Sequence, residues 1–256
     1  MDEELKKQIQ YLGLNVLAEN WDGVQKEALK KKPSYQSFLS SIVKKEYLAK
    51  IEKARLARIK RATIPENYVM ETFPFDKQPK LDKKLVYELY DSLNFIEEKQ
   101  DLIFIGPTGC GKTGLATAFL LQAISKGYRG LFVDFSLLIS KLYQSRGDHS
   151  EERLIKNLST IELLLIDELG YISCKKEQAS LFFDLMRRRS KKTTTIITTQ
   201  LGFEEWGNFL YNQHITAALL DRITVNCALF NMKDCISIRA KKIMYAFKKE
   251  QNIAQS

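Results

Sequence analysis

The chain has 256 residues, of which 45% are hydrophobic and 28% charged, and it contains four cysteines. These proportions are typical of a globular protein with one large or two small domains. No apolar run approaches the roughly eighteen residues of a membrane helix, no apolar stretch follows the charged N-terminus, and no C-x-x-C pair is present, so we expect a cytoplasmic protein without a membrane span, secretory signal or zinc site.

The net charge of +9 is concentrated at the two ends of the chain. Residues 1–65 contain 14 Lys and Arg against 8 Asp and Glu, residues 239–256 contain 5 against 1, and the remainder contains 21 against 22. A basic surplus outside a balanced centre suits a polyanionic partner, most simply DNA or RNA. Lysine-rich helix faces in contact with water would give the same composition.

The first part of the sequence has the pattern of helices. Apolar residues recur at helical spacing from Leu5 to Val16 and from Phe38 to Val43, and a long helical pattern carrying many basic residues runs from Ser40 to Arg61. We therefore predict a small all-helical domain over residues 1–62, with a role in DNA binding or self-association. The basic residues near its end that are candidates for DNA contact are Lys53, Arg55, Arg58, Lys60 and Arg61.

A linker is predicted over residues 63–80. Thr63-Ile64-Pro65 interrupts the helical pattern, and the segment continues through Thr72-Phe73-Pro74-Phe75-Asp76 to Pro79. Helix breakers and aromatic residues together indicate an ordered segment that packs on another part of the protein.

Residues 81–256 alternate between helical patterns and short apolar runs. This alternation indicates an α/β fold with a parallel sheet of five strands, covered by helices on both faces to give three layers. The five candidate strands are Leu102–Ile105, Leu131–Asp134, Leu163–Ile166, Thr194–Thr198 and Cys227–Phe230.

A phosphate-binding loop follows the first of these strands. The residues fit the pattern G-x-x-x-x-G-K-[ST] between a strand and a helical run. Glycines allow backbone N–H groups to turn toward phosphate oxygens, and the helix N-terminus adds its positive end. We expect Lys112 to reach the β- and γ-phosphates of ATP and the Thr113 hydroxyl to ligate Mg²⁺. The residues predicted to contact the nucleotide are Gly106, Pro107, Thr108, Gly109, Cys110, Gly111, Lys112, Thr113 and Gly114.

Two acidic residues end the apolar strand that begins at Leu163. The carboxyl ends of buried parallel strands meet at the ligand-binding edge of the sheet, which places these residues beside the phosphate loop. We expect Asp167 to hold Mg²⁺, directly or through water, and Glu168 to polarise the attacking water. This combination predicts an ATP hydrolase rather than a protein that only binds nucleotide.

The β-branched run from Thr193 ends in Thr199 and Gln200. If this strand lies between the two described above, one of these polar side chains faces the γ-phosphate. Gln200 is the better candidate because its amide can both donate and accept hydrogen bonds. A strand end that only caps the sheet would also have this sequence.

Several arginines are candidates for further roles. Arg222 closes a helical stretch and is a candidate arginine finger to a neighbouring subunit's γ-phosphate, and Arg239 is a candidate contact to the phosphates of its own subunit. A single arginine in a basic chain is weak support for either role. Arg187, Arg188 and Arg189, followed by Lys191 and Lys192, form a second basic cluster that could contact DNA or only face water.

The motifs together resemble those of the AAA+ ATPases, and within them the IstB-like transposition helpers and the related DnaC-like helicase loaders. The resemblance covers almost the whole chain. The segments that carry it, besides the phosphate loop, are Tyr11-Leu12-Gly13-Leu14, Ser37-Phe38-Leu39, the basic helix up to Arg61-Ala62, Phe73-Pro74-Phe75-Asp76, Asp167-Glu168-Leu169-Gly170-Tyr171, Phe203-Glu204-Glu205-Trp206-Gly207 and Thr216-Ala217-Ala218-Leu219-Leu220-Asp221-Arg222.

This resemblance implies specific roles. Phe73 and Phe75 fall in the linker that packs near the adenine. Gln200 falls at sensor 1, where the family usually has asparagine, Arg222 at the arginine finger that acts in trans, and Arg239 at sensor 2. The resemblance also implies ATP-dependent self-assembly on double-stranded DNA, target selection, and stimulation of a transposase encoded by the same mobile element.

Other functions are also compatible with parts of this pattern. A DnaC-like replicative helicase loader is the main alternative, and it would be expected to expose aromatic side chains for stacking on single-stranded DNA. A module that binds ATP without hydrolysing it would not need Glu168. A small-molecule kinase would need a base for the substrate hydroxyl and a lid, and the sequence indicates neither.

Overall fold

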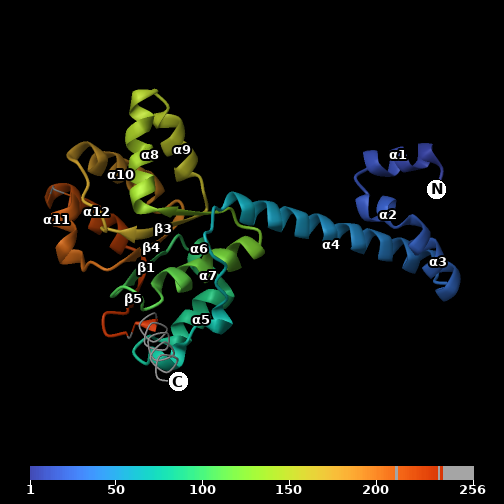
Figure 1. Ribbon diagram of the computed structural model, residues 1–256, viewed down its shortest axis with the longest axis horizontal. Helices are drawn as coiled ribbons and strands as arrows, with labels where there is room; N and C mark the ends of the chain where they lie inside the picture. The colour runs from blue at the N-terminus through green and yellow to red at the C-terminus, as the bar shows by residue number, and fades with distance from the viewer. Residues whose placement is uncertain (211–212, 236, 239–256) are drawn as a thin grey trace, which may run out of the picture. The chain divides into compact units, whose positions relative to one another are not determined.

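In this computed structural model, residues 1–210, 213–235 and 237–238 are described. The chain divides into two compact units, Met1–Ala57 and Arg58–Ser256, whose elements are labelled in Figure 1. Within the described residues, none of the helices combines the length and the apolar character needed to cross a membrane.

The first unit consists of helices. Asp2 caps the first of them by accepting a hydrogen bond from the Glu4 amide at 3.3 Å. Ile9 and Val24 are buried, and the buried carboxylate of Glu46 accepts a hydrogen bond from the Leu17 amide at 2.7 Å. The helices are α1 (Glu3–Tyr11), α2 (Asn15–Glu19), α3 (Trp21–Lys31) and α4 (Tyr35–Arg61), the last of which ends within the second unit.

The second unit is built on a parallel sheet of five strands in the order β2-β3-β4-β1-β5. The predicted α/β fold with a five-stranded parallel sheet is confirmed, and each predicted strand is present, with bounds that differ by at most a few residues. The strands are β1 (Asp101–Ile105), β2 (Gly130–Asp134), β3 (Leu163–Leu169), β4 (Thr194–Thr199) and β5 (Cys227–Asn231).

Alternate residues of the central strands contribute to two separate cores. Leu102, Leu165 and Ile196 join one hydrophobic cluster, whereas Ile103 and Ile166 join the other. Successive side chains of a strand point to opposite faces, so both faces of these central strands are buried. Helix α7 covers the first face and helices α8, α10 and α12 cover the second.

The remaining elements connect and cover the strands. The α-helices are α5 (Lys83–Ser92), α6 (Asn94–Glu97), α7 (Lys112–Ser125), α8 (Phe135–Gly147), α9 (Glu151–Ser159), α10 (Lys176–Arg189), α11 (Trp206–Leu210) and α12 (Gln213–Thr224), and the 3₁₀ turns are η1 (Met70–Thr72), η2 (Phe75–Lys77) and η3 (Phe203–Glu205).

The start of the linker is attached to the edge strand β2. The Ala62 carbonyl accepts a hydrogen bond from the Phe132 amide at 2.8 Å, and the Thr63 hydroxyl donates to the Phe132 carbonyl at 2.7 Å. Further along, Phe75 is buried in the cluster that α7 covers. The linker is therefore an ordered part of the second unit, attached to β2 at its start and packed in the core at Phe75.

Candidate functional site

The phosphate loop lies between β1 and α7, at the carboxyl edge of the sheet. Gly111 adopts a φ of +100°, in the left-handed region that favours glycine. At Gly106 a Cβ would lie 2.6 Å from the Met232 carbonyl oxygen, so only glycine fits this close approach. The Lys112 Nζ donates to the carbonyls of Gly106 at 2.8 Å and Pro107 at 2.9 Å, which places its ammonium group over the loop.

The metal-binding pair predicted from the sequence is assembled by the fold. The Thr113 hydroxyl donates to the Asp167 carboxylate at 2.9 and 3.2 Å, across 54 residues of chain. Burial raises the pKa of Asp167, whereas hydrogen bonds from Thr198 and Thr113 oppose the rise. The nearby Asp134, which pairs with Asp167 across β2 and β3, also raises this pKa.

This donor set suits Mg²⁺. A hydroxyl and a carboxylate are hard oxygen ligands, and Mg²⁺ takes one or two protein carboxylates together with phosphate oxygens and water. Within the described residues there is no group of three or more His, Cys, Asp or Glu that could hold a metal by itself. The pair Thr113 and Asp167 therefore fits a magnesium ion that is bound together with a nucleotide.

Glu168 points away from Asp167 although the two are consecutive. The backbone of Glu168 has a φ of +56°, and the β3–β4 register shifts between Ile166 and Leu169. As a result Asp167 is buried while Glu168 is exposed and lines the cavity beside the phosphate loop. This backbone conformation separates a residue suited to metal binding from one suited to contact with water.

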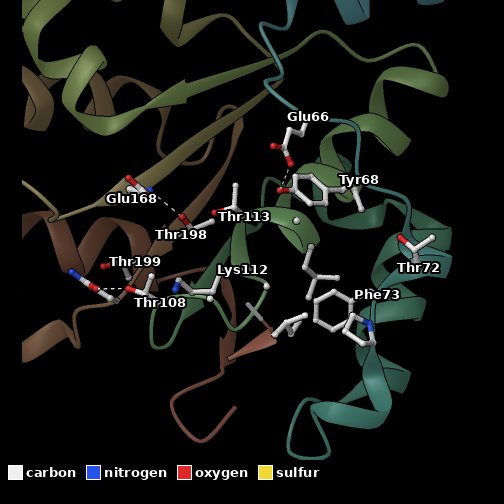
Figure 2. A pocket seen from close by; sticks show the side chains of 18 of the residues that line it. Glu66, Tyr68, Thr72, Phe73, Thr108, Lys112, Thr113, Glu168, Thr198 and Thr199 are labelled. Carbon is white, nitrogen blue, oxygen red and sulfur yellow. Dashed lines mark hydrogen bonds between the residues drawn. The ribbon is translucent and has the colours of Figure 1, made fainter. Parts of the chain in front are cut away.

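One cavity of about 870 Å³ is lined by residues of the phosphate loop, by Glu168 and by residues of the linker. Figure 2 shows Lys112, Thr113 and Glu168 toward one end and Tyr68 and Phe73 toward the other. The cavity can hold a phosphate chain at the loop and an aromatic ring at the linker.

Sequence comparison assigns the chain to a family. The sequence profile described as IstB-like ATP binding protein matches residues 7–246. The chain belongs to this IstB-like family.

Relatives agree with this assignment, and a solved structure shares the fold. A protein of insertion sequence IS21 from Pseudomonas aeruginosa is 34% identical over 230 residues, covering 90% of this chain and 86% of that protein. A protein of insertion sequence IS5376 from Geobacillus stearothermophilus is 29% identical over 98% of this chain and the whole of the relative. The structure of the DnaC helicase loader shares the fold, with a TM-score of 0.52, 22% identity, and coverage of 67% of this chain and 97% of the loader.

In this IstB-like protein, Gln200 lines the cavity. Its side-chain oxygen accepts a hydrogen bond from the Thr108 hydroxyl of the phosphate loop at 3.2 Å. The neighbouring Thr199 hydroxyl donates to the Leu169 carbonyl at 2.8 Å and accepts from the Leu201 amide at 3.0 Å. The Thr199 hydroxyl is thus bonded to backbone, and Gln200 is the better placed of the two for a phosphate.

The two linker aromatics have different surroundings. Phe73 lines the cavity, and its Cε2 atom would lie 2.7 Å from a Cβ on Gly111. Phe75 is buried outside the cavity lining, with its ring 4.8 Å from that of Phe73 and the Lys83 ammonium 5.4 Å from its centroid. The structure therefore places Phe73, and not Phe75, where it can contact a nucleotide directly.

The two candidate arginines lie outside the cavity or outside the described chain. Arg222 donates to the Ala218 carbonyl at 2.7 Å, and its guanidinium lies 4.9 Å from the Phe183 ring centroid. It is not among the described residues that line the cavity. Arg239 lies outside the described residues.

The prediction that the basic cluster on α10 contacts DNA is corrected at one residue. Arg189 is completely buried and donates to the carbonyls of Leu158, Ile161 and Thr194. Its guanidinium satisfies carbonyl groups inside the fold, so the structure removes Arg189 from the candidates for DNA contact. The clustering of three basic residues in the sequence did not distinguish an inward-facing position of the helix from an outward-facing one.

The other basic candidates differ in their availability. Arg187 pairs with Asp184, and Arg188 pairs with both Asp184 and Glu152. On α4, Arg55 pairs with Glu52 and the Arg58 Nε donates to the Ile124 carbonyl. The exposed cations of the two clusters are Lys53, Lys60, Arg61, Arg187, Lys191 and Lys192, of which Arg187 is paired with Asp184.

Sequence reasoning missed several residues at the cavity. Tyr68 packs against the first turn of α7, 3.0 Å from the position of a Cβ on Gly114, and the Ile238 amide donates a hydrogen bond to the Gly109 carbonyl of the loop at 2.9 Å. Thr198 contacts both acidic residues of β3. The aromatic character of Tyr68 within the linker was a usable signal, whereas Ile238 and Thr198 have no local pattern that marks them.

Proposed function

We propose that this chain binds ATP with Mg²⁺, hydrolyses it, and uses ATP to control its assembly on duplex DNA as a helper of the transposase of its mobile element. The observation that carries the catalytic part is the arrangement of Thr113, Asp167 and Glu168 at one end of a single cavity. Asp167 is buried, Thr113 is half-buried and lines the cavity, and Glu168 is exposed toward the space that a γ-phosphate would fill.

The residues divide the chemistry between them. The phosphate loop and the N-terminus of α7 bind the phosphates, and Lys112 exchanges its loop carbonyl partners for the β- and γ-phosphate oxygens. Thr113 and Asp167 would hold Mg²⁺, which neutralises charge on the phosphate oxygens when bound. Glu168 orients and polarises the attacking water, and Gln200 contacts the γ-phosphate or that water.

The proposed assembly on duplex DNA and the proposed transposase partner are supported by different observations. The family and the two relatives from insertion sequences supply the transposition context. Exposed cations at the end of α4 and after α10 are available for phosphate contacts, which are independent of DNA sequence. The trans role of Arg222 requires a second subunit, so the proposed active form is an oligomer.

One structural observation favours the helicase-loader alternative. The first unit exposes Tyr11, Tyr35 and Tyr47, with relative exposures of 92%, 91% and 62%. Exposed aromatic rings stack on the bases of single-stranded nucleic acid. The likeness to the DnaC loader is a likeness of fold and adds no support of its own.

The first experiment compares ATP hydrolysis without DNA, with duplex DNA and with single-stranded DNA, and sediments the same mixtures. The transposition-helper proposal expects duplex DNA to change turnover and ATP to drive a large complex on it. Assembly on single-stranded DNA alone would replace it with the loader function, and absence of turnover in every mixture would contradict the ATPase assignment.

Glu168→Gln tests the role of the water-orienting carboxylate. A positioned general base contributes typically about 10²–10⁴-fold to rate, so we expect ATP to remain bound while turnover falls by at least about a hundredfold. Glu177→Gln, an exposed glutamate of α10 outside the cavity lining, is the matched control and should turn over ATP normally. Wild-type turnover in Glu168→Gln would show that another group orients the water.

A further inference from the structure

The bulge between β3 and β4 leaves a gap in the sheet beside the two acidic residues. Register pairs Ile166 with Ile197 and then Leu169 with Thr199. Asp167 and Glu168 together therefore face the single residue Thr198. Such a bulge bends the strand and leaves a backbone group outside the ladder.

Thr198 fills this gap with its side chain. The Thr198 hydroxyl accepts a hydrogen bond from the Glu168 amide at 3.0 Å and donates a short hydrogen bond to Asp167 Oδ1. A hydroxyl can donate only one hydrogen bond, so the orientation of the Thr198 hydroxyl is fixed when it donates this bond to the Asp167 carboxylate. Thr198 itself is 1% exposed, which holds this geometry in a rigid part of the sheet.

These contacts link the metal ligand to the water-orienting residue. One bond sets the position of the Asp167 carboxylate opposite Thr113, and the other holds the Glu168 backbone in its left-handed conformation. A non-glycine residue in this conformation needs support from its surroundings. Figure 2 shows the Thr198 side chain between Thr113 and Glu168.

We propose that Thr198 is the positioning residue for both acidic groups: it aligns Asp167 for Mg²⁺ and directs Glu168 into the cavity. This inference rests on the proposed ATPase function and adds to it a residue outside the phosphate loop and the acidic pair. Thr198 acts through its two neighbours and is not itself assigned a chemical step.

The test compares Thr198→Val, which keeps the shape and removes the hydroxyl, with Thr198→Ser, which keeps the hydroxyl. ATP affinity is measured with Mg²⁺ and with EDTA, and turnover is measured against Mg²⁺ concentration. A hydrogen bond to a charged group contributes about 1.5–3 kcal/mol, equivalent to about 10- to 100-fold. We expect Thr198→Val to lose about that factor in kcat and to require more Mg²⁺ for the gain in ATP affinity, with affinity in EDTA unchanged and KM for ATP little changed at saturating Mg²⁺.

Thr194→Val is the matched control. It removes another buried hydroxyl from β4, one that donates to the Phe95 carbonyl at 3.2 Å near the opposite end of the strand. This variant should also lower the melting temperature, while keeping wild-type kcat and Mg²⁺ dependence. Thr198→Ser should restore both quantities to within about threefold, well inside the factor expected from the lost bond.

These measurements distinguish a failure of the Thr198 positioning role from a failure of the proposed ATPase function. The gain in ATP affinity on adding Mg²⁺ does not require hydrolysis, so it reports on Thr198 even if the wild-type chain turned over no ATP. Unchanged Mg²⁺ dependence and kcat in Thr198→Val, or equal impairment in Thr198→Ser, would overturn the positioning role. If Thr198→Val does not fold, Thr198→Cys, a much weaker hydrogen-bond donor, replaces it in the comparison with Thr198→Ser and is judged by the same criteria.

Discussion

Substitution of Gly111 by alanine tests whether the nucleotide cavity depends on the close contact between loop and linker. Gly111 has a φ of +100°, and a Cβ there would lie 2.7 Å from Phe73 Cε2 and 3.1 Å from Ile238 Cδ1. Because 3.4 Å is the lower limit of ordinary contact, Phe73 would have to withdraw by about 0.7 Å. The substitution therefore moves the aromatic wall of the cavity as well as straining the backbone.

Gly127 provides a control for the backbone strain alone. Its φ is +107°, and a Cβ there would meet nothing within 4 Å. An alanine in such a conformation costs on the order of 1–3 kcal/mol of stability at either position. Overpacking adds about 1–3 kcal/mol at Gly111 only. We therefore expect Gly111→Ala to be the less stable variant and to lose at least about tenfold in ATP affinity, whereas Gly127→Ala should bind ATP like the wild type.

The assay combines thermal unfolding with equilibrium binding of a fluorescent ATP analogue. Both variants should unfold at lower temperature than the wild type, by about 2–4 °C for each kcal/mol in a unit of this size. Wild-type affinity of Gly111→Ala for the analogue would contradict this prediction, because it would show that Phe73 and the loop tolerate the displacement. Equal loss of affinity in the two variants would show that strain, and not contact with Phe73, is responsible.

Two further predictions concern groups outside the cavity. Arg222→Ala should leave the nucleotide affinity of the isolated chain unchanged and remove the rise of specific turnover with protein concentration; an equal loss in dilute and concentrated protein would exclude a trans role. Burial raises the pKa of Asp101 from 3.8 to about 7, against the opposing hydrogen bond from the Thr195 amide and the charge of Arg189. The folded state therefore binds this proton more tightly than the unfolded state, and the stabilisation, on the order of 4 kcal/mol, is present below about pH 4 and lost as the pH rises through about 7. Asp101→Asn keeps an acceptor for Thr195, so its free energy of unfolding, measured by denaturant titration, should fall less steeply than that of the wild type between pH 5 and 7; parallel profiles would contradict the protonation of Asp101.

Much of the site was predictable because its residues belong to local patterns. The phosphate loop is a contiguous run between a strand and a helix, and Asp167 and Glu168 directly follow an apolar strand. Parallel strands place their carboxyl ends at one edge of a sheet, so the position of these groups relative to the loop follows from the order of elements along the chain.

Other features depend on contacts between distant parts of the chain. Arg189 looked like one member of a basic run, but it lies on the inward face of α10 and satisfies carbonyls of α9, of the segment before β3 and of β4. Phe73 and Phe75 are separated by one residue, yet only Phe73 reaches the cavity. Charge and aromatic character identified the residues, and neither property indicates which way a side chain points.

The fold class, the phosphate loop and the acidic pair could be predicted from local sequence, because periodicity and motif spacing are properties of short segments. How the acidic pair is held depends on contacts between distant parts of the chain. The register shift between β3 and β4 arises where Glu168 and Thr198, 30 residues apart in the chain, meet, and it sends Glu168 toward the cavity while Asp167 stays buried. Thr198 acquires its role from that pairing alone, since no local pattern distinguishes it from the other threonines of its strand.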